Sequence, residues 1–178
     1  MLSSPAEIWI VGGGPSALLF PLSRLVGKAV IAVNDSVTRL QEFQPVCFSA
    51  DKMWVRRHRQ FLLAYGGPKY FALPLDNWPS CGDYPGSIYL KRSYQKGLCL
   101  TPGTVSTGGN SGYASINLAY HLGAKTINLV GFDMNGNTPK FRQWIPKFRA
   151  LNFDLNALGV RVINRNPSSA IDAFDREV

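Results

Sequence analysis

Residues 7–16 read EIWIVGGGPS, a short apolar run that ends abruptly in three glycines. An apolar run without polar alternation is typical of a strand that is buried on both faces, as in a parallel sheet. The glycines permit a tight turn directly after it, and a helix can begin at Ser16 if Pro21 lies in its first turn or kinks it. This stretch predicts the first strand, turn and helix of an α/β sheet.

Similar apolar runs recur along the chain, and helical patterns lie between several of them. The further strands are expected at residues 29–33, 46–48, 69–73, 126–130 and 160–164. A helix is expected at 112–121, and a long one at 140–158, where apolar residues recur every three or four positions and Gly159 provides a stop. The alternation predicts one doubly wound, mostly parallel sheet with helices on both faces. Residues 74–109 are rich in Pro, Gly and Asp, too long for an ordinary connection, and expected to form an irregular lid.

Composition limits the class of protein. With 178 residues, 46% of them apolar, the chain suits a single domain over 1–178. No apolar run reaches the roughly 18 residues that cross a bilayer and the N-terminus lacks signal-peptide features, so we expect a soluble, cytoplasmic protein without a membrane partner. The net charge of +8 favours anionic partners, and the cations gather in three stretches, 52–59, 91–96 and 140–149. Cys47, Cys81 and Cys99 have neither disulfide nor zinc spacing.

Polar residues follow the predicted strands where ligands bind in such sheets, beyond the carboxyl ends. They are Gly12–Gly14, Asn34–Asp35, Ser49–Asp51 and Gly131–Asp133, joined by the helix start at 107–112. Two glycine-rich turns that open helices predict two sets of free backbone N–H groups for an anion. The glycine turn matches neither the spaced dinucleotide fingerprint nor the Walker motif, so a plain turn stays open. Helix capping by Asp35 and Asp51 and a turn role for Asp133 also stay open.

Four motifs taken in order resemble a superfamily with two enzyme branches. They are VGGGPSAL at 11–18, Asn34-Asp35, NSGY at 110–113 and GAKTINLVGFDM at 123–134. One branch is the bacterial sialyltransferases of the CMP-sialic-acid type; the other is the archaeal 6-hydroxymethylpterin diphosphokinase-like family. The motifs also look like those of small bacteriophage and prophage proteins. The resemblance spans roughly residues 8–134 and implies a Rossmann-like fold that holds a nucleotide.

The resemblance also implies which residues form the site. Nucleotide contacts would come from Gly12, Gly13, Gly14, Ser16, Asn34, Asp35, Asn110, Ser111, Gly112 and Asp133, and catalytic groups from Asp133, Asp51 and His58. One departure stands out: the sialyltransferases take a general-base histidine from the region after the Gly-Phe-Asp motif, whereas this chain has no histidine beyond His121. A lone histidine in a helix-like stretch such as His58 is more often structural or solvated than catalytic. A diphosphokinase would instead need carboxylates that hold Mg²⁺, for which the aspartates named above are available, but its paired-aspartate motif is not cleanly present.

The leading hypothesis is a nucleotide-dependent transferase, glycosyltransferase-like, that uses a nucleotide sugar of the CMP-sugar type. A Mg²⁺-dependent, ATP-using diphosphokinase is the second. A non-catalytic phage protein that binds or sequesters a nucleotide is the third, and the missing late histidine favours it. A weaker idea is nucleic-acid binding through the basic clusters, with Tyr84, Tyr89 and Tyr94 stacking on bases. The sequence does not determine the acceptor, the metal requirement or whether the chain forms a homo-oligomer.

Overall fold

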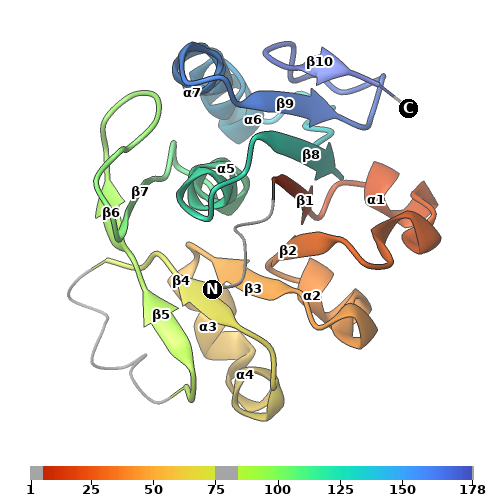
Figure 1. Cartoon of the computed structure of the whole chain (residues 1–178), viewed down its shortest axis with the longest axis vertical. Helices are drawn as coiled ribbons and strands as arrows, with labels where there is room; N and C mark the ends of the chain where they lie inside the picture. The colour runs from red at the N-terminus through yellow and green to blue at the C-terminus, as the bar shows by residue number, and fades with distance from the viewer. Residues whose placement is uncertain (1–5, 75–83, 178) are drawn as a thin grey trace.

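A computed structural model describes residues 6–74 and 84–177, and over these ranges eight strands form one parallel sheet in the order β10-β9-β8-β1-β2-β3-β4-β5 (Figure 1). The strands are β1 (Glu7–Val11), β2 (Ala29–Val33), β3 (Val46–Ser49), β4 (Lys69–Phe71), β5 (Ser87–Tyr89), β8 (Thr126–Val130), β9 (Arg161–Asn164) and β10 (Asp175–Arg176). The chain runs outward from β1 to β5, then returns to place β8 on the other side of β1. The predicted doubly wound, Rossmann-like α/β fold is confirmed, with its switch point between β1 and β8.

Helices cover both faces of the sheet. Side chains of β1 alternate: Ile8 and Ile10 join the core cluster that contains helix α5 (Ser111–His121) and helix α7 (Lys147–Ala157). Trp9 and Val11 join the cluster on the opposite face. That face is covered by the short helices α1 (Ser16–Leu19), α2 (Ser36–Arg39), α3 (Lys52–Arg57) and α4 (Arg59–Ala64), together with the 3₁₀ turns η1 (Leu22–Leu25) and η2 (Gln41–Phe43). Figure 1 shows α5 and α7 on one side of the central strands and α1 and α2 on the other.

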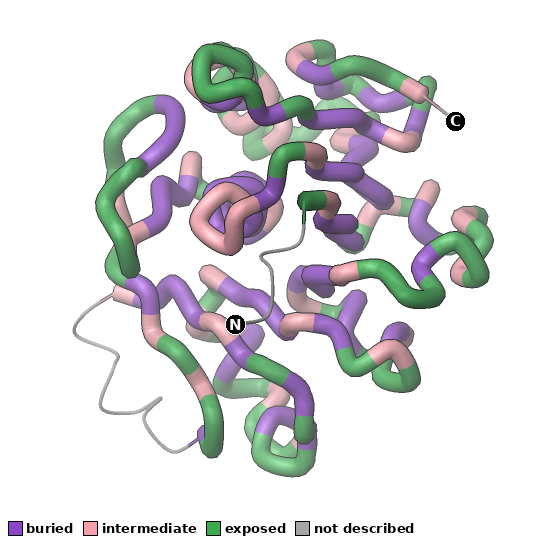
Figure 2. The backbone as a smooth tube through the Cα atoms, in the orientation of Figure 1, coloured by how far each residue is buried: buried purple, intermediate pink, exposed green. Residues whose placement is uncertain are grey.

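Helix α5 is the centre of the molecule. Eight of its residues are buried, and Figure 2 shows buried backbone gathered in α5 and the central strands. Its Asn117 side chain accepts hydrogen bonds from the N–H groups of Cys99 and Ser106, both at 2.9 Å, and donates to the Cys99 carbonyl at 3.0 Å. A fully buried amide with three backbone partners ties the segment 98–106 to α5.

The segment that was expected to be an irregular lid contains regular structure. Residues 75–83 lie outside the described ranges, and the described remainder supplies edge strand β5 and a two-stranded parallel sheet of β6 (Lys91–Ser93) and β7 (Thr104–Ser106). The Ser106 N–H of β7 donates a hydrogen bond to the Asn117 side chain, and this contact holds β7 against α5 although the segment has few apolar runs.

Two predicted helices are shorter than expected, and proline is the reason in both. The first ends at Leu19 after one turn, because Phe20 precedes Pro21 and adopts an extended conformation with ψ 128°. The expected helix over 140–158 is divided into α6 (Pro139–Trp144) and α7, because Pro146 has no N–H to continue the ladder and its ring conflicts with the carbonyl one turn earlier. Within residues 6–74 and 84–177, no helix is long and apolar enough to span a bilayer.

A small buried polar cluster lies at the amino end of β4. The Lys69 ammonium donates to the carbonyls of Tyr65 at 2.6 Å and Gly67 at 3.3 Å, and burial lowers its pKa. Cys47 is fully buried, and desolvation raises the pKa of its thiol to about 12. Burial likewise raises the pKa of Tyr65 to about 12. The thiol and the phenol are therefore held neutral by the fold well above neutral pH.

This cluster predicts a loss of stability at alkaline pH. The Cys47 thiol ionises near 9.0 in an unfolded chain and near 12 in the folded one, so raising the pH between those values favours unfolding. From pH 8 to pH 10 the contribution of Cys47 is a loss on the order of 1 kcal/mol in the free energy of unfolding. Urea unfolding of wild type and Cys47→Ala at pH 8, 9 and 10 measures it.

The variant should lose less stability over this range than the wild type. The raised pKa of Tyr65 also lowers the free energy of unfolding as the pH rises. The lowered pKa of Lys69 acts in the opposite direction, because the unfolded state binds the proton of this amine more tightly than the folded state does. Both remain in the variant, so the difference between the two pH dependences isolates the thiol. Parallel curves for the two proteins would show that the Cys47 thiol does not contribute.

Candidate functional site

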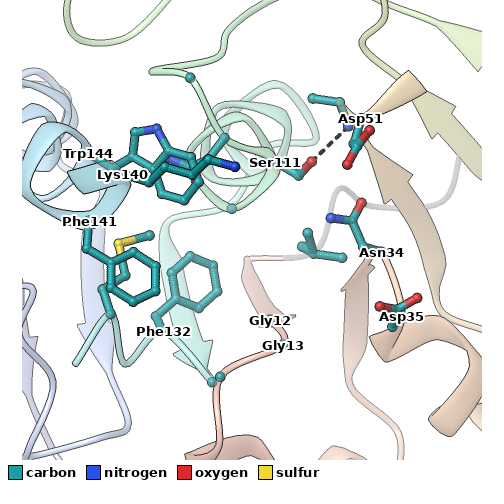
Figure 3. A pocket seen from close by; sticks show the side chains of 18 of the residues that line it. Gly12, Gly13, Asn34, Asp35, Asp51, Ser111, Phe132, Lys140, Phe141 and Trp144 are labelled. Atoms are coloured by element: carbon teal, nitrogen blue, oxygen red, sulfur yellow. Dashed lines mark hydrogen bonds between the residues drawn. The ribbon is translucent and has the colours of Figure 1, made fainter. Parts of the chain in front are cut away.

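A cavity of about 880 Å³ opens at the carboxyl ends of the strands, beside the switch point between β1 and β8. Its walls come from the glycine turn after β1, the ends of β2, β3 and β8, the start of α5 and helix α6 (Figure 3). All the residues predicted to contact a nucleotide line it except Ser16: Gly12, Gly13, Gly14, Asn34, Asp35, Asn110, Ser111, Gly112 and Asp133. Asp51 lines the cavity as well, whereas His58 does not line it and lies 3.3 Å from the Asp35 carboxylate.

The glycine turn is docked onto the end of β8. The N–H of Gly12 donates to the Val130 carbonyl at 2.8 Å and that of Gly14 to the Gly131 carbonyl at 2.9 Å. The N–H of Ser16 points to the Asp133 carboxylate at 3.3 Å. The expectation of free donors in this turn is therefore wrong for these three N–H groups, because β8 and the residues after it already use them. Among the described residues, nothing accepts from the Gly13 N–H.

Asp133 is a clamp between three segments. Its side chain is 7% exposed and accepts from the Ser16 hydroxyl at 2.9 Å and from the Asn166 amide at 2.6 Å. Asn164 and Ser169 in turn donate to the carbonyl of the preceding Phe132, at 3.1 and 2.6 Å. Both carboxylate oxygens of Asp133 are engaged by the protein. In this structure Asp133 holds the glycine turn in place, and Ser16 supplies the hydroxyl and N–H donors for that contact.

The start of α5 keeps free donors that face the cavity. Asn110 caps the helix by accepting from the Tyr113 N–H at 2.8 Å, and the Ser111 hydroxyl accepts from the Ala50 N–H at 3.0 Å. No described residue accepts from the N–H groups of Ser111 and Gly112. The N-terminus of an 11-residue helix carries partial positive charge. Of the two glycine-rich turns, the one before α5 keeps the unpaired N–H groups at a helix start that were predicted for both.

Three buried polar atoms in the cavity wall have no hydrogen-bond partner among the described residues: Asn34 Oδ1, Asn110 Nδ2 and Arg92 Nε. Asn34 has the left-handed backbone conformation, with φ 53°. Buried polar groups without partners cost free energy, and those in native proteins are usually satisfied by water or ligand. All three belong to residues that line the same cavity.

The predicted carboxylates at the other strand ends have different surroundings. Asp51 caps α3, and its Oδ1 accepts from the N–H groups of Met53 at 2.8 Å and Trp54 at 3.2 Å. Asp35 makes no side-chain cap to α2. Its Oδ1 accepts from the Trp54 indole at 2.6 Å and lies 3.3 Å from His58 Nε2. Capping is thus the role of Asp51 but not of Asp35.

The cavity also contains residues that sequence reasoning did not assign to it. Phe132, Phe141 and Trp144 form an aromatic wall, opposite the polar side chains of Asn34 and Asp51 in Figure 3. Phe141 and Trp144 belong to the apolar positions of the helix expected over 140–158, and the helix break at Pro146 is the signal that was missed. Lys52, Arg92 and Lys140 are the cations of the cavity. Each comes from a different one of the three basic stretches seen in the sequence. Their spacing along the chain does not predict that the three stretches meet at one cavity.

The tyrosines proposed to stack on bases do not form a common surface. Tyr84 is 5% exposed and its ring centroid lies 5.7 Å from that of Phe71. Tyr89 packs against the same ring, also at 5.7 Å. Tyr94 is 80% exposed. Of the three tyrosines, Tyr84 is therefore buried, Tyr89 is half-buried and Tyr94 is exposed.

Within residues 6–74 and 84–177, no group of three or more His, Cys, Asp and Glu side chains is arranged to hold a metal ion. Cys47 and Cys99 are buried free thiols, and Cys81 lies outside the described residues.

Comparison with protein-family models finds no match, and comparison with curated proteins finds none. Among solved structures, an α-2,3/8-sialyltransferase mutant matches with a TM-score of 0.39 and 16% identity, over 96% of this chain and 85% of that chain. A similarity this low says nothing about chemistry, which therefore rests on the residues of the cavity.

The docked turn predicts opposite outcomes for neighbouring glycines. A Cβ on Gly14 would overlap the Asp133 carboxylate and lie 2.5 Å from the Gly131 carbonyl, whereas a Cβ on Gly13 meets nothing within 4 Å. Gly14→Ala should lower the free energy of unfolding by about 1–3 kcal/mol, and Gly13→Ala should change it by less than about 1 kcal/mol. Chemical denaturation of both variants measures this, and equal stabilities would contradict the docked geometry.

Proposed function

We propose that this cavity binds a nucleotide and that the protein is a glycosyltransferase-like enzyme acting on a nucleotide sugar of the CMP-sugar type. The observation that carries the proposal is the convergence, at one switch-point cavity, of the N–H groups at the start of α5, unpaired among the described residues, with the cations Lys52, Arg92 and Lys140. Open α/β sheets bind nucleotides at this position. The cavity volume of about 880 Å³ lies within the range of cofactor-sized sites.

Charge supports an anionic ligand. The cavity carboxylates Asp35, Asp51 and Asp133 all accept hydrogen bonds from the protein. The cavity cations Lys52, Arg92 and Lys140 have no ion-pair partner among the described residues, unlike Arg149, Arg161 and Arg165, which pair with carboxylates at 2.6, 3.0 and 3.1 Å. Three carboxylates that already accept hydrogen bonds from the protein, beside three cations that have no carboxylate partner in the described part of the chain, favour a ligand that brings negative charge.

The phosphates fit best at the start of α5. The N–H groups of Ser111 and Gly112 and the helix dipole would stabilise a phosphate there, with Arg92 and Lys140 as counter-charges. The glycine turn would contribute space, because Gly13 carries no side chain into the cavity. The aromatic wall of Phe132, Phe141 and Trp144 offers ring faces to a base or sugar.

Two alternatives use the same cavity and differ in the step after binding. A diphosphokinase would bind ATP with Mg²⁺, for which Asp35 and Asp51 each keep one oxygen that no described residue hydrogen-bonds. A sequestering protein would bind a nucleotide and release it unchanged. The sequence favours the latter in one respect, since no histidine follows His121.

A ligand panel distinguishes these three functions. Thermal unfolding with CMP, CMP-sugars, UDP-sugars, ATP and GTP, with and without Mg²⁺, should show a rise in Tm with a cytidine nucleotide that does not need Mg²⁺. The reason is that a ligand that binds only the folded state raises the midpoint by mass action. A shift with ATP that requires Mg²⁺ would instead favour the diphosphokinase, and the absence of any shift would rule out the nucleotide site.

Arg92 provides a matched test of the charge argument. Arg92→Gln should weaken binding of the stabilising nucleotide about 10-fold, because it removes an unpaired cation from the cavity. Arg149→Gln removes the same charge from α7, where Arg149 pairs with Asp172 outside the cavity, and should leave affinity unchanged. Isothermal titration measures both dissociation constants. Equal losses in the two variants would indicate a general effect of net charge.

A further inference from the structure

Glycosyl transfer to a hydroxyl group needs a proton acceptor, and this chain has no histidine after Gly131-Phe132-Asp133 to supply one. Three carboxylates line the cavity, and their surroundings separate them. Asp133 is 7% exposed and engaged at both oxygens. Among the described residues, Asp51 and Asp35 each accept through Oδ1 alone. Asp51 does so as the cap of α3, whereas Asp35 caps no helix and has a side chain that is 77% exposed.

Asp35 is held by two side chains of the α3–α4 region that are themselves stacked. The Trp54 indole N–H donates to Oδ1 at 2.6 Å, and His58 Nε2 lies 3.3 Å from the same atom. The rings of Trp54 and His58 are stacked with centroids 4.4 Å apart and planes 20° from parallel. Trp54 is 3% exposed, so the stack is anchored in the core. One oxygen of Asp35 is thereby held in position, no described residue hydrogen-bonds Oδ2, and Asp35 lines the cavity.

The hydrogen bonds of His58 determine where its protons lie. Nδ1 is 2.9 Å from the carbonyl oxygen of Trp54, which can only accept, so Nδ1 carries a proton. The other ring nitrogen, Nε2, faces Asp35 Oδ1 at a distance of 3.3 Å, so the imidazole packs beside the carboxylate.

We propose that Asp35 is the general base of the transfer and that His58 is its positioning residue; this rests on the proposed function. Asp35 Oδ2 takes the proton of the acceptor hydroxyl while that oxygen forms a bond to the anomeric carbon. The bond from the anomeric carbon to the phosphate oxygen breaks, and its electron pair leaves with the nucleotide. The proton on Oδ2 then passes to solvent water. Trp54 and His58 keep Oδ1 engaged, so that Oδ2 is the oxygen presented to the acceptor.

The experiment compares binding with turnover in the full-length protein. Nucleotide release from the CMP- or UDP-sugar that gives the largest rise in Tm is measured with water and with simple sugars as acceptors. Asp35→Asn should lower the rate of release by at least about 100-fold and leave the rise in Tm unchanged. Asp172→Asn is the matched control, because Asp172 is also an exposed aspartate paired with a cation, outside the cavity.

His58 is tested by separating kcat from KM for nucleotide release. If His58 positions Asp35, His58→Ala should lower kcat about 10-fold and leave KM unchanged. His58→Gln keeps a polar amide beside the carboxylate and should retain most of the wild-type kcat. His121→Gln is the control, because His121 bonds the Thr104 carbonyl at 2.9 Å and does not line the cavity.

The outcomes separate this inference from the function it rests on. If no nucleotide raises Tm, the proposed function fails. If a nucleotide sugar binds but wild-type protein releases no nucleotide, the protein sequesters its ligand and Asp35 is not a base. If release proceeds unchanged in Asp35→Asn, or is abolished in Asp51→Asn instead, the base lies elsewhere. An unchanged kcat in His58→Ala would exclude His58 from positioning Asp35.

Discussion

The close contact between the ends of β1 and β8 is the constraint on which the rest of the structure depends. Gly12, Gly14 and Gly131 meet there, and a side chain on any of them would enter the space of the opposite backbone: a Cβ on Gly131 would lie 2.6 Å from the Gly12 carbonyl oxygen. Gly131 also has φ 74°, which few other residues adopt. The Asp133 carboxylate closes the contact through Ser16 and Asn166. The strand ends are thereby locked on either side of the switch point, and the cavity forms beside them.

Around this contact, the carboxylates of the cavity wall differ from the other polar side chains. Each carboxylate accepts hydrogen bonds from the protein, whereas Arg92, Asn34 and Asn110 each keep one buried atom without a partner among the described residues. Asp133 and Asp51 act structurally, one as a clamp and one as a cap. Asp35 differs because it caps no helix and only one of its oxygens accepts a hydrogen bond from the described residues. Position at a strand end alone therefore does not decide whether a carboxylate supports the fold or faces a ligand.

Proline shapes the other side of the cavity. Pro146 divides a stretch with continuous helical periodicity, so that Phe148, Leu151 and Leu155 of α7 enter the core while Phe141 and Trp144 of α6 line the cavity. The same apolar pattern thus serves two purposes. The aromatic wall exists because α6 is free to leave the direction of α7, and because Thr138 caps its start through the Phe141 N–H at 3.2 Å.

Local sequence determined the parallel strands, the α5 helix with its Asn110 cap, and the strand ends from which the cavity is built, because buried apolar runs and glycine turns depend on neighbours along the chain. Only the tertiary structure decided which groups of that cavity are free. The N–H groups of the glycine turn are taken by the end of β8, Asp133 by Ser16 and Asn166, and Asp51 by α3. Arg92, Lys140 and the Asp35–His58 pair meet the site from segments far apart in sequence. Hydrogen-bond partners across a parallel sheet are set by strand order, and strand order is a property of the packed whole.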